Sequence, residues 1–171
     1  MYQPENAPLI QKHFKGFLHE LDMSKNDGID PRFKDLCNKT ILQAYRDLIN
    51  YDDSCASITL QIEALNWFHE NDVNNYFNCP NICELIGISY RKVLIKVWDY
   101  LATNEELVQE YQYRAFTEYY LEKALKIALK YYCFTNNKIK EVIQEWKSKT
   151  NGDERWFKRQ LNKRLNIIWN K

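Results

Sequence analysis

Glycine and proline are scarce in this sequence, with four of each among 171 residues. A many-stranded sheet needs such residues in its turns, so their scarcity argues against a β fold. Apolar residues instead recur at intervals of three and four, which is the spacing of amphipathic helices. With 45% hydrophobic and 15% aromatic residues, the chain has enough apolar material to bury a core. The sequence therefore predicts an all-α fold, built as a multi-helix bundle.

Long apolar runs are also missing. No run reaches the roughly 20 residues that a membrane-spanning helix needs, and the first residues lack the basic segment and apolar run of a signal peptide. The cysteines are odd in number and do not have the spacing of a disulfide framework: Cys37, Cys55, Cys79, Cys83 and Cys133. We therefore expect a soluble protein of the reducing cytoplasm that contacts no membrane.

Motifs of catalysis and metal binding are absent as well. The sequence contains no Gly-rich phosphate loop, nucleophile elbow, Cys-x-x-Cys pair or His-Glu-x-x-His motif. The acidic loop around Gly28 does not fit a calcium site, because aligning this glycine with that of an EF-hand puts Met23 and Lys34 where carboxylates belong. Cys79 and Cys83 do not have the spacing of common zinc motifs. We expect no enzyme activity, no metal and no cofactor.

The stretch from Cys79 to Trp98 carries the most specific pattern. Gly87 divides it into two helical segments, because a tight turn between steeply crossed helices needs a residue that accepts left-handed dihedrals. Cys83 is small enough for close helix packing, and Ser89 stands where the second helix needs its N-cap. Apolar residues around the turn are spaced to form one buried seam: Ile82, Ile86, Ile88 and Val93. In the second helix the residues predicted to face inward are Val93, Leu94, Val97, Trp98 and Leu101.

This stretch resembles the helix-turn-helix superfamily of DNA-binding proteins. In that superfamily the second helix enters the major groove, and its first residues touch base edges. The resemblance therefore implies DNA contact by residues of the second helix, namely Ser89, Tyr90, Arg91, Lys92 and Lys96. The alternative interpretation is that Gly87 forms a simple turn between two core helices.

The chain is expected to have three parts. Residues 1–57 form an N-terminal helical segment that packs on the core, residues 58–102 form the trihelical helix-turn-helix module, and residues 103–171 form C-terminal helices with a basic last helix. Charge is distributed unevenly, since residues 1–79 hold 12 acidic and 7 basic side chains, whereas residues 80–171 hold 11 acidic and 17 basic ones. A basic C-terminal half is typical of a protein that faces a polyanion.

The last helix combines an apolar face with a cationic one. Asp153 and Glu154 are placed to begin this helix at its positive dipole end, and no acidic residue follows them. The cations predicted to contact phosphates are Arg155, Lys158, Arg159 and Lys163. The alternatives are a solvated surface and contact with a partner protein.

These patterns favour a small bacterial or phage transcription regulator that binds double-stranded DNA. A palindromic target would require a homodimer, and the apolar segment 104–132, read as one long helix or as two joined near Tyr113, offers surface for it. Its aromatic residues are expected in the core or in a dimer contact. Two alternatives stay open: a helical protein-protein interaction module without nucleic acid, and RNA binding through the Tyr-rich, basic C-terminal half.

Overall fold

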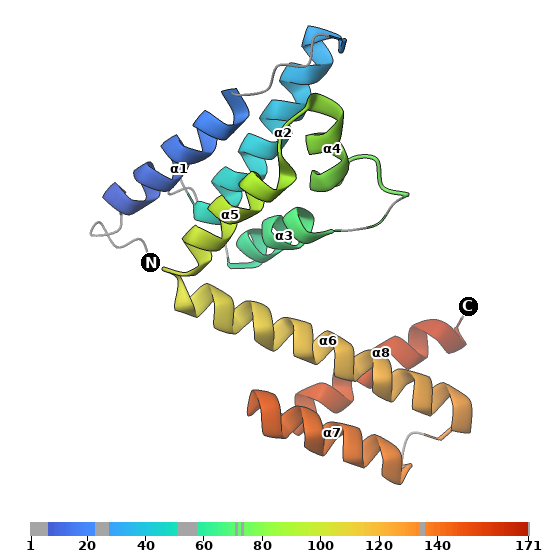
Figure 1. The fold of residues 1–171 in the computed structure, drawn as a ribbon. Coiled ribbons are helices and arrows are strands. Elements are labelled where there is room, and N and C mark those ends of the chain that lie inside the picture. Colours follow the sequence, from blue (N-terminus) through green and yellow to red (C-terminus); the bar gives the residue numbers. More distant parts are fainter. Residues whose placement is uncertain are drawn as a thin grey trace. The chain divides into compact units, whose positions relative to one another are not determined.

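The computed structural model describes residues 7–22, 28–50, 58–70, 72, 74–133 and 136–170. Within these residues the chain forms eight α-helices and no strand (Figure 1), so the predicted all-α fold is confirmed. The chain divides into two compact units, Met1–Leu107 and Val108–Lys171, and each is described by itself below.

The first unit holds five of these helices: α1 (Ala7–Asp22), α2 (Pro31–Ile49), α3 (Ile58–His69), α4 (Cys79–Ile86) and α5 (Tyr90–Leu101). Local chemistry explains where several begin. The carboxylate of Asp30 accepts a hydrogen bond from the backbone N–H of Arg32 at 2.8 Å, and Pro31 occupies the first turn of α2, where no N–H is needed. The side chain of Asn78 caps α4 in the same way.

Aromatic side chains from three helices form the centre of the first unit. Phe17 of α1 stacks on Tyr45 of α2, with 3.8 Å between ring centroids and 4° between planes. Both rings meet Phe68 of α3 edge to face. All three side chains are fully buried. Helix α1 is therefore part of the core of the first unit.

The turn between α4 and α5 has the predicted conformation. Gly87 ends α4 with φ at 77°, in the left-handed region that favours glycine. The residues expected to form a seam, Ile82, Ile86, Ile88 and Val93, are all buried, as is Cys83. Ser89 stands at the N-cap position of α5, but its side chain makes no capping hydrogen bond.

Trp98 was expected to face inward, and this prediction is wrong. Its side chain is 50% exposed, and its indole N–H donates a hydrogen bond to Nε2 of His69 at 3.2 Å. The inner positions of α5 are taken by Val93, Val97 and Tyr100. A polar partner at the end of α3 thus holds the indole near the surface, where helical spacing alone predicts burial.

The second unit is built from α6 (Glu105–Tyr131), which begins in the first unit, together with α7 (Asn137–Thr150) and α8 (Glu154–Trp169). The segment around Tyr113 lies inside α6, so 105–131 is one helix. Helix α8 begins at Asp153 and Glu154 as expected, and Asp153 is its N-cap, accepting a hydrogen bond from the N–H of Arg155 at 2.8 Å.

The core of the second unit surrounds Trp146, which is fully buried. Its indole N–H donates to the hydroxyl of Thr117 at 3.0 Å, and that hydroxyl donates to the carbonyl oxygen of Tyr113 at 2.7 Å. The ring also lies against the backbone of Gly152, where an added Cβ would be 2.3 Å from a ring carbon. Glycine is required at that position because the α7–α8 turn touches the indole.

Candidate nucleic-acid interface

The first turn of α5 presents the residues that the resemblance assigns to base contact. Ser89 and Arg91 are exposed, and Arg91 makes no ion pair with any residue that the structure describes. Tyr90 is half-buried, and its hydroxyl donates to the carbonyl oxygen of Phe68 at 2.7 Å. That bond satisfies a carbonyl in the last turn of α3 and fixes the start of α5 to that helix.

Helix α1 packs beside α5 (Figure 1). The ammonium of Lys92 is 3.7 Å from the carboxylate of Glu20, and one helical turn further the ammonium of Lys96 lies over Gly16. Residue numbers rise along α5 as they fall along α1, so the two helices are antiparallel. Lys92 and Lys96, both predicted to contact DNA, are therefore turned toward α1.

Beyond Lys96, a groove of about 310 Å³ lies between α1 and α5. It is lined by Leu9, Lys12, His13, Gly16, Lys96, Asp99 and Thr103. Burial is the main cause that lowers the pKa of His13. The carboxylate of Asp99 raises this pKa, whereas the charges of Lys12 and Lys96 lower it. Both lysines are thus within electrostatic reach of the imidazole.

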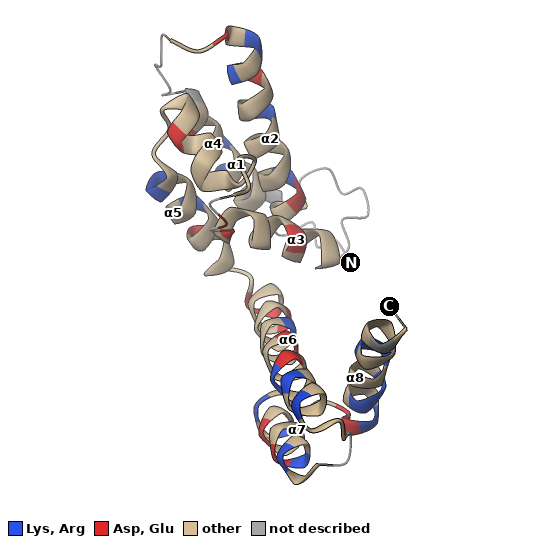
Figure 2. Ribbon diagram, turned by 90° about the vertical axis from the view of Figure 1, so that its right-hand side faces the viewer, with Lys and Arg blue, Asp and Glu red and all other residues tan. Residues whose placement is uncertain are grey.

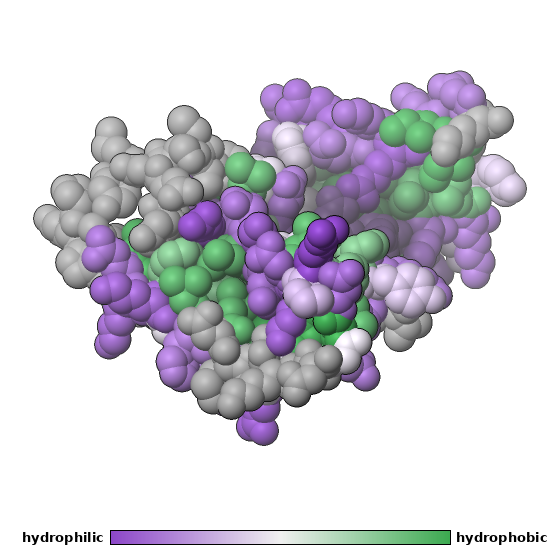
Figure 3. Space-filling view, turned by 90° about the horizontal axis from the view of Figure 1, so that it is seen from above, coloured by the Kyte–Doolittle hydropathy of each residue, from purple (hydrophilic) through white to green (hydrophobic). Residues whose placement is uncertain are grey.

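The outer face of α5 is more apolar than an expected DNA-reading face. Ile95 is 41% exposed and Trp98 is 50% exposed, at positions that follow Arg91 by one and two turns. Since an indole N–H can only donate, Nε2 of His69 must accept its hydrogen bond, and Nδ1 carries the proton that goes to the Leu65 carbonyl oxygen at 2.9 Å. Figure 3, which views the molecule from above, shows apolar side chains exposed between polar ones on that side of the surface.

Helix α8 carries a row of cations at a spacing of four residues (Figure 2). Arg155, Arg159 and Lys163 are all exposed, and none forms an ion pair within the described part of the chain. Two neighbouring cations are already paired. Lys158, which was also predicted to contact phosphate, forms an ion pair with Glu154, and Arg164 binds both oxygens of Glu118 at 2.7 Å. Among the described residues of α8, Arg155, Arg159 and Lys163 therefore form an exposed cationic surface without ion-pair partners; we call it the α8 row.

A second groove, of about 480 Å³, lies between α6 and α7 in the second unit. Phe116 and Tyr119 on its wall are 40% and 60% exposed, so they lie outside the core of this unit. Lys149 stands 5.9 Å from the centroids of the Phe116 and Tyr120 rings. Hydrogen bonds from Lys123 and from the Tyr120 hydroxyl lower the pKa of Glu145, which therefore stays ionised beside the groove.

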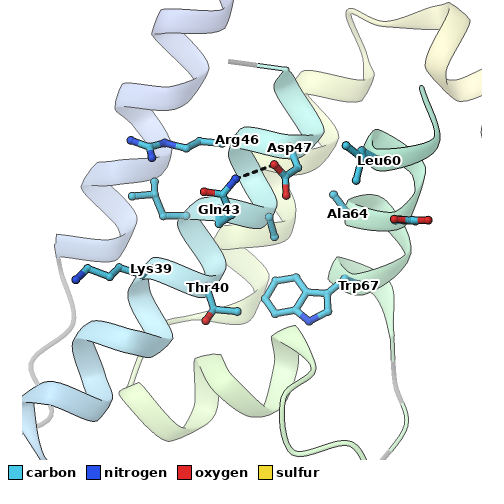
Figure 4. A pocket seen from close by; sticks show the side chains of 11 residues that line it. Lys39, Thr40, Gln43, Arg46, Asp47, Leu60, Ala64 and Trp67 are labelled. Atoms are coloured by element: carbon cyan, nitrogen blue, oxygen red, sulfur yellow. Dashed lines mark hydrogen bonds between the residues drawn. The ribbon is translucent and has the colours of Figure 1, made fainter. Parts of the chain in front are cut away.

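A third groove lies between α2 and α3 and measures about 860 Å³ (Figure 4). Trp67 of α3 points into it, opposite Thr40 of α2. The amide of Gln43 donates to Asp47 at 2.8 Å on the α2 side. Its described lining combines both charge signs, with Lys39 and Arg46 opposed by Asp47 and Glu63.

Comparison of the chain with protein-family models, with curated proteins and with solved structures finds no match. In the part of the chain that the structure describes, no three or more His, Cys, Asp or Glu are grouped to hold a metal ion. Of the acidic loop considered for calcium, residues 23–27 lie outside the described residues. No described helix combines the length and the apolar character needed to cross a bilayer.

Sequence reasoning did not find Lys12 or His13, because nothing in the order of residues says that α1 packs beside α5. One weak signal was present. Gly16 interrupts an otherwise regular amphipathic helix, and such a glycine often has a packing reason. The side chain of Lys96 lies over it, 3.5 Å from the position of an added Cβ.

Proposed function

We propose that this protein binds double-stranded DNA and reads it with the first turn of α5. The observation that carries the proposal is the α4–α5 turn, in which Gly87 adopts the left-handed conformation and the exposed side chains of Ser89 and Arg91 follow at once. The opposite face of α5 is buried at Val93 and Val97, so the helix is held firmly while its polar start remains accessible. An arginine in this place suits bidentate contact with guanine.

The α8 row supports the same proposal from the second unit. Arg155, Arg159 and Lys163 stand one turn apart without carboxylate partners among the described residues, which leaves their full charge for phosphates. Arg155 also lies at the start of α8, beside the capping carboxylate of Asp153. We assign sequence reading to α5 and sequence-independent phosphate contact to α8.

The test is binding of the purified protein to a random-sequence DNA duplex at several salt concentrations, with sequence selection on the bound fraction. Arg91→Ala should relax the base preference at one position and cost about 1–3 kcal/mol at the selected site. Arg159→Ala should weaken binding to all sequences and reduce the salt slope by about 0.9.

Matched controls remove the same charge elsewhere in the same unit. Arg32→Ala on α2 is the control for Arg91, and Lys140→Ala on α7 is the control for Arg159, because both side chains are exposed. Absence of DNA binding by the parent at low salt would overturn the proposal. If Arg91→Ala and Arg32→Ala selected the same sequences with equal affinity, α5 would not be the reading helix.

A protein partner is the second candidate, and the exposed Ile95 and Trp98 favour it. Apolar side chains one turn apart on the outer face of α5 are better suited to another protein than to DNA phosphates. Under this alternative, Trp98→Ala would abolish capture of a defined partner, and DNA binding would be absent. RNA binding would show as preference for RNA when both nucleic acids compete.

We also infer a reducing compartment, in keeping with a cytoplasmic regulator. Cys37, Cys79 and Cys83 are buried thiols, and the two sulfur atoms of α4 lie 3.8 Å apart without a disulfide bond. Homodimerisation stays part of the proposal for a palindromic target, and sedimentation of the protein with and without its selected duplex tests it.

A further inference from the structure

We propose that the groove between α1 and α5 is a phosphate-binding subsite, in which Lys12 of α1 and Lys96 of α5 hold one phosphate group of the DNA strand beside the reading helix. The inference rests on the proposed function, and it gives α1 a part in binding that its sequence does not suggest. Both lysines line the groove together with His13 and Gly16.

The charge of the groove favours an anion. Two ammonium groups line the groove with a single carboxylate, that of Asp99, and neither lysine forms an ion pair in the part of the chain described. Both lysines and His13 line the same groove, so a phosphate bound there would lie within reach of both ammonium groups. Each ammonium group would attract the phosphate.

The position of Lys96 depends on α1. At Gly16 an added Cβ would contact the Lys96 side chain at 3.5–3.9 Å, so this lysine is laid across the backbone of α1. It is half-buried, in contrast to a lysine that projects freely into a DNA groove. Direct contact between Lys96 and bases is therefore less favoured than contact with a phosphate at the edge of α5.

The packing of α1 makes the subsite rigid. Phe17 is fully buried against Tyr45, and Glu20 pairs with Lys92 one turn from Gly16. The backbone positions of Lys12 and Lys96 are thus fixed before any ligand arrives. Lys96, which is half-buried over Gly16, loses less side-chain freedom on binding a phosphate than the exposed Lys12 does.

The experiment measures DNA affinity against salt for Lys12→Ala and for its matched control, Lys15→Ala. Lys15 is an exposed lysine on the same helix that does not line the groove. Lys12→Ala should reduce the salt slope by about 0.9, the value for one phosphate, whereas Lys15→Ala should leave it close to that of the parent. Equal slopes for the two variants would overturn the subsite while leaving DNA binding intact.

A second readout separates this inference from the proposed function. Titration of the protein with millimolar inorganic phosphate should shift the imidazole resonances of His13 but not those of His19, which is exposed on the same helix. Lys12→Ala should abolish the shift. If DNA did not bind but phosphate shifted His13, the subsite would stand for another phosphate-bearing ligand and the DNA proposal would fall. If neither bound, both would be wrong.

Discussion

The ammonium group of Lys92 lies 3.7 Å from the carboxylate of Glu20. A carboxylate of α1 therefore neutralises a cation that the helix-turn-helix resemblance assigns to DNA. The side chain of Glu20 is only 16% exposed, whereas that of Lys92 is 57% exposed, so the lysine is the more accessible partner. Helix α1 thus contacts the lysines of α5 at two successive turns. Glu20 pairs with Lys92, and Gly16 lies under the side chain of Lys96.

Replacing Glu20 with Gln should strengthen DNA binding. The change releases Lys92 and removes a negative charge beside α5, and a partly exposed ion pair contributes about 0.2–1 kcal/mol, so affinity at low salt should rise by a factor of about 1.4 to 5. Glu63→Gln removes the same charge from an exposed position on α3 and serves as control. An unchanged affinity for Glu20→Gln would mean that Lys92 does not contact DNA.

Gly16→Ala should stabilise the first unit. The position is inside α1, and the nearest atom to an added Cβ is the flexible end of Lys96 at 3.5 Å, so the methyl group fits. Alanine in a helix interior is favoured over glycine by up to about 1 kcal/mol. Urea unfolding followed by circular dichroism measures the gain, and a loss of stability would show that Lys96 cannot move aside.

Gly152→Ala should have the opposite effect in the second unit. Its Cβ would lie 2.3 Å from the ring of the fully buried Trp146, so either the turn or the indole must move. Overpacking of this kind costs about 1–3 kcal/mol. The same unfolding measurement tests it, and Asn151→Ala, at the adjacent left-handed C-cap, separates the steric effect from backbone strain. A neutral Gly152→Ala would contradict the close contact.

Thr117→Val should destabilise the second unit although it conserves shape. The substitution leaves the buried Trp146 N–H without its acceptor, and an unsatisfied buried donor costs about 1–3 kcal/mol. Thr117→Ser keeps the hydroxyl and loses only a methyl group, so it is the matched control. If the two variants unfolded at the same urea concentration, the hydrogen bond would not be the source of the stability.

Stability of the first unit should fall as pH decreases below about 6.5, with a contribution from His13. Burial lowers the pKa of His13 in the folded protein, so the unfolded chain takes up the proton first and acid favours unfolding. The stability that depends on neutral His13 is fully present above pH 6.5. It is lost as the pH falls from 6.5 toward the lowered pKa of His13 in the folded protein. His13→Gln should flatten this part of the profile, whereas His19→Gln should not.

Local features of the fold could be predicted from the sequence. Asp30, Gly87 and Asp153 determine helix ends through their own hydrogen bonds or dihedrals, and such effects depend on a few neighbouring residues. The same holds for the buried seam around the α4–α5 turn. These features require no knowledge of which helices meet.

Features that depend on packing between distant helices could not be predicted. Trp98 is near the surface because His69, far away in the sequence, accepts its hydrogen bond. Lys96 is half-buried because α1 lies beside α5, and Lys158 is less available than Arg159 because it pairs with Glu154. Helical spacing places these residues on a face, but the neighbour of that face is decided by tertiary structure.

The contact between Trp146 and its neighbours also provides an optical signal for the second unit. Trp146 and Trp156 stack with 6.4 Å between ring centroids and 19° between planes, and Trp146 has no access to solvent. Two indoles held this close in a fixed orientation couple their electronic transitions, so their near-ultraviolet dichroism reports tertiary order of the second unit. Replacing Trp156 with Phe would identify the part of the signal that comes from this pair, because the first unit has ordered aromatic rings of its own.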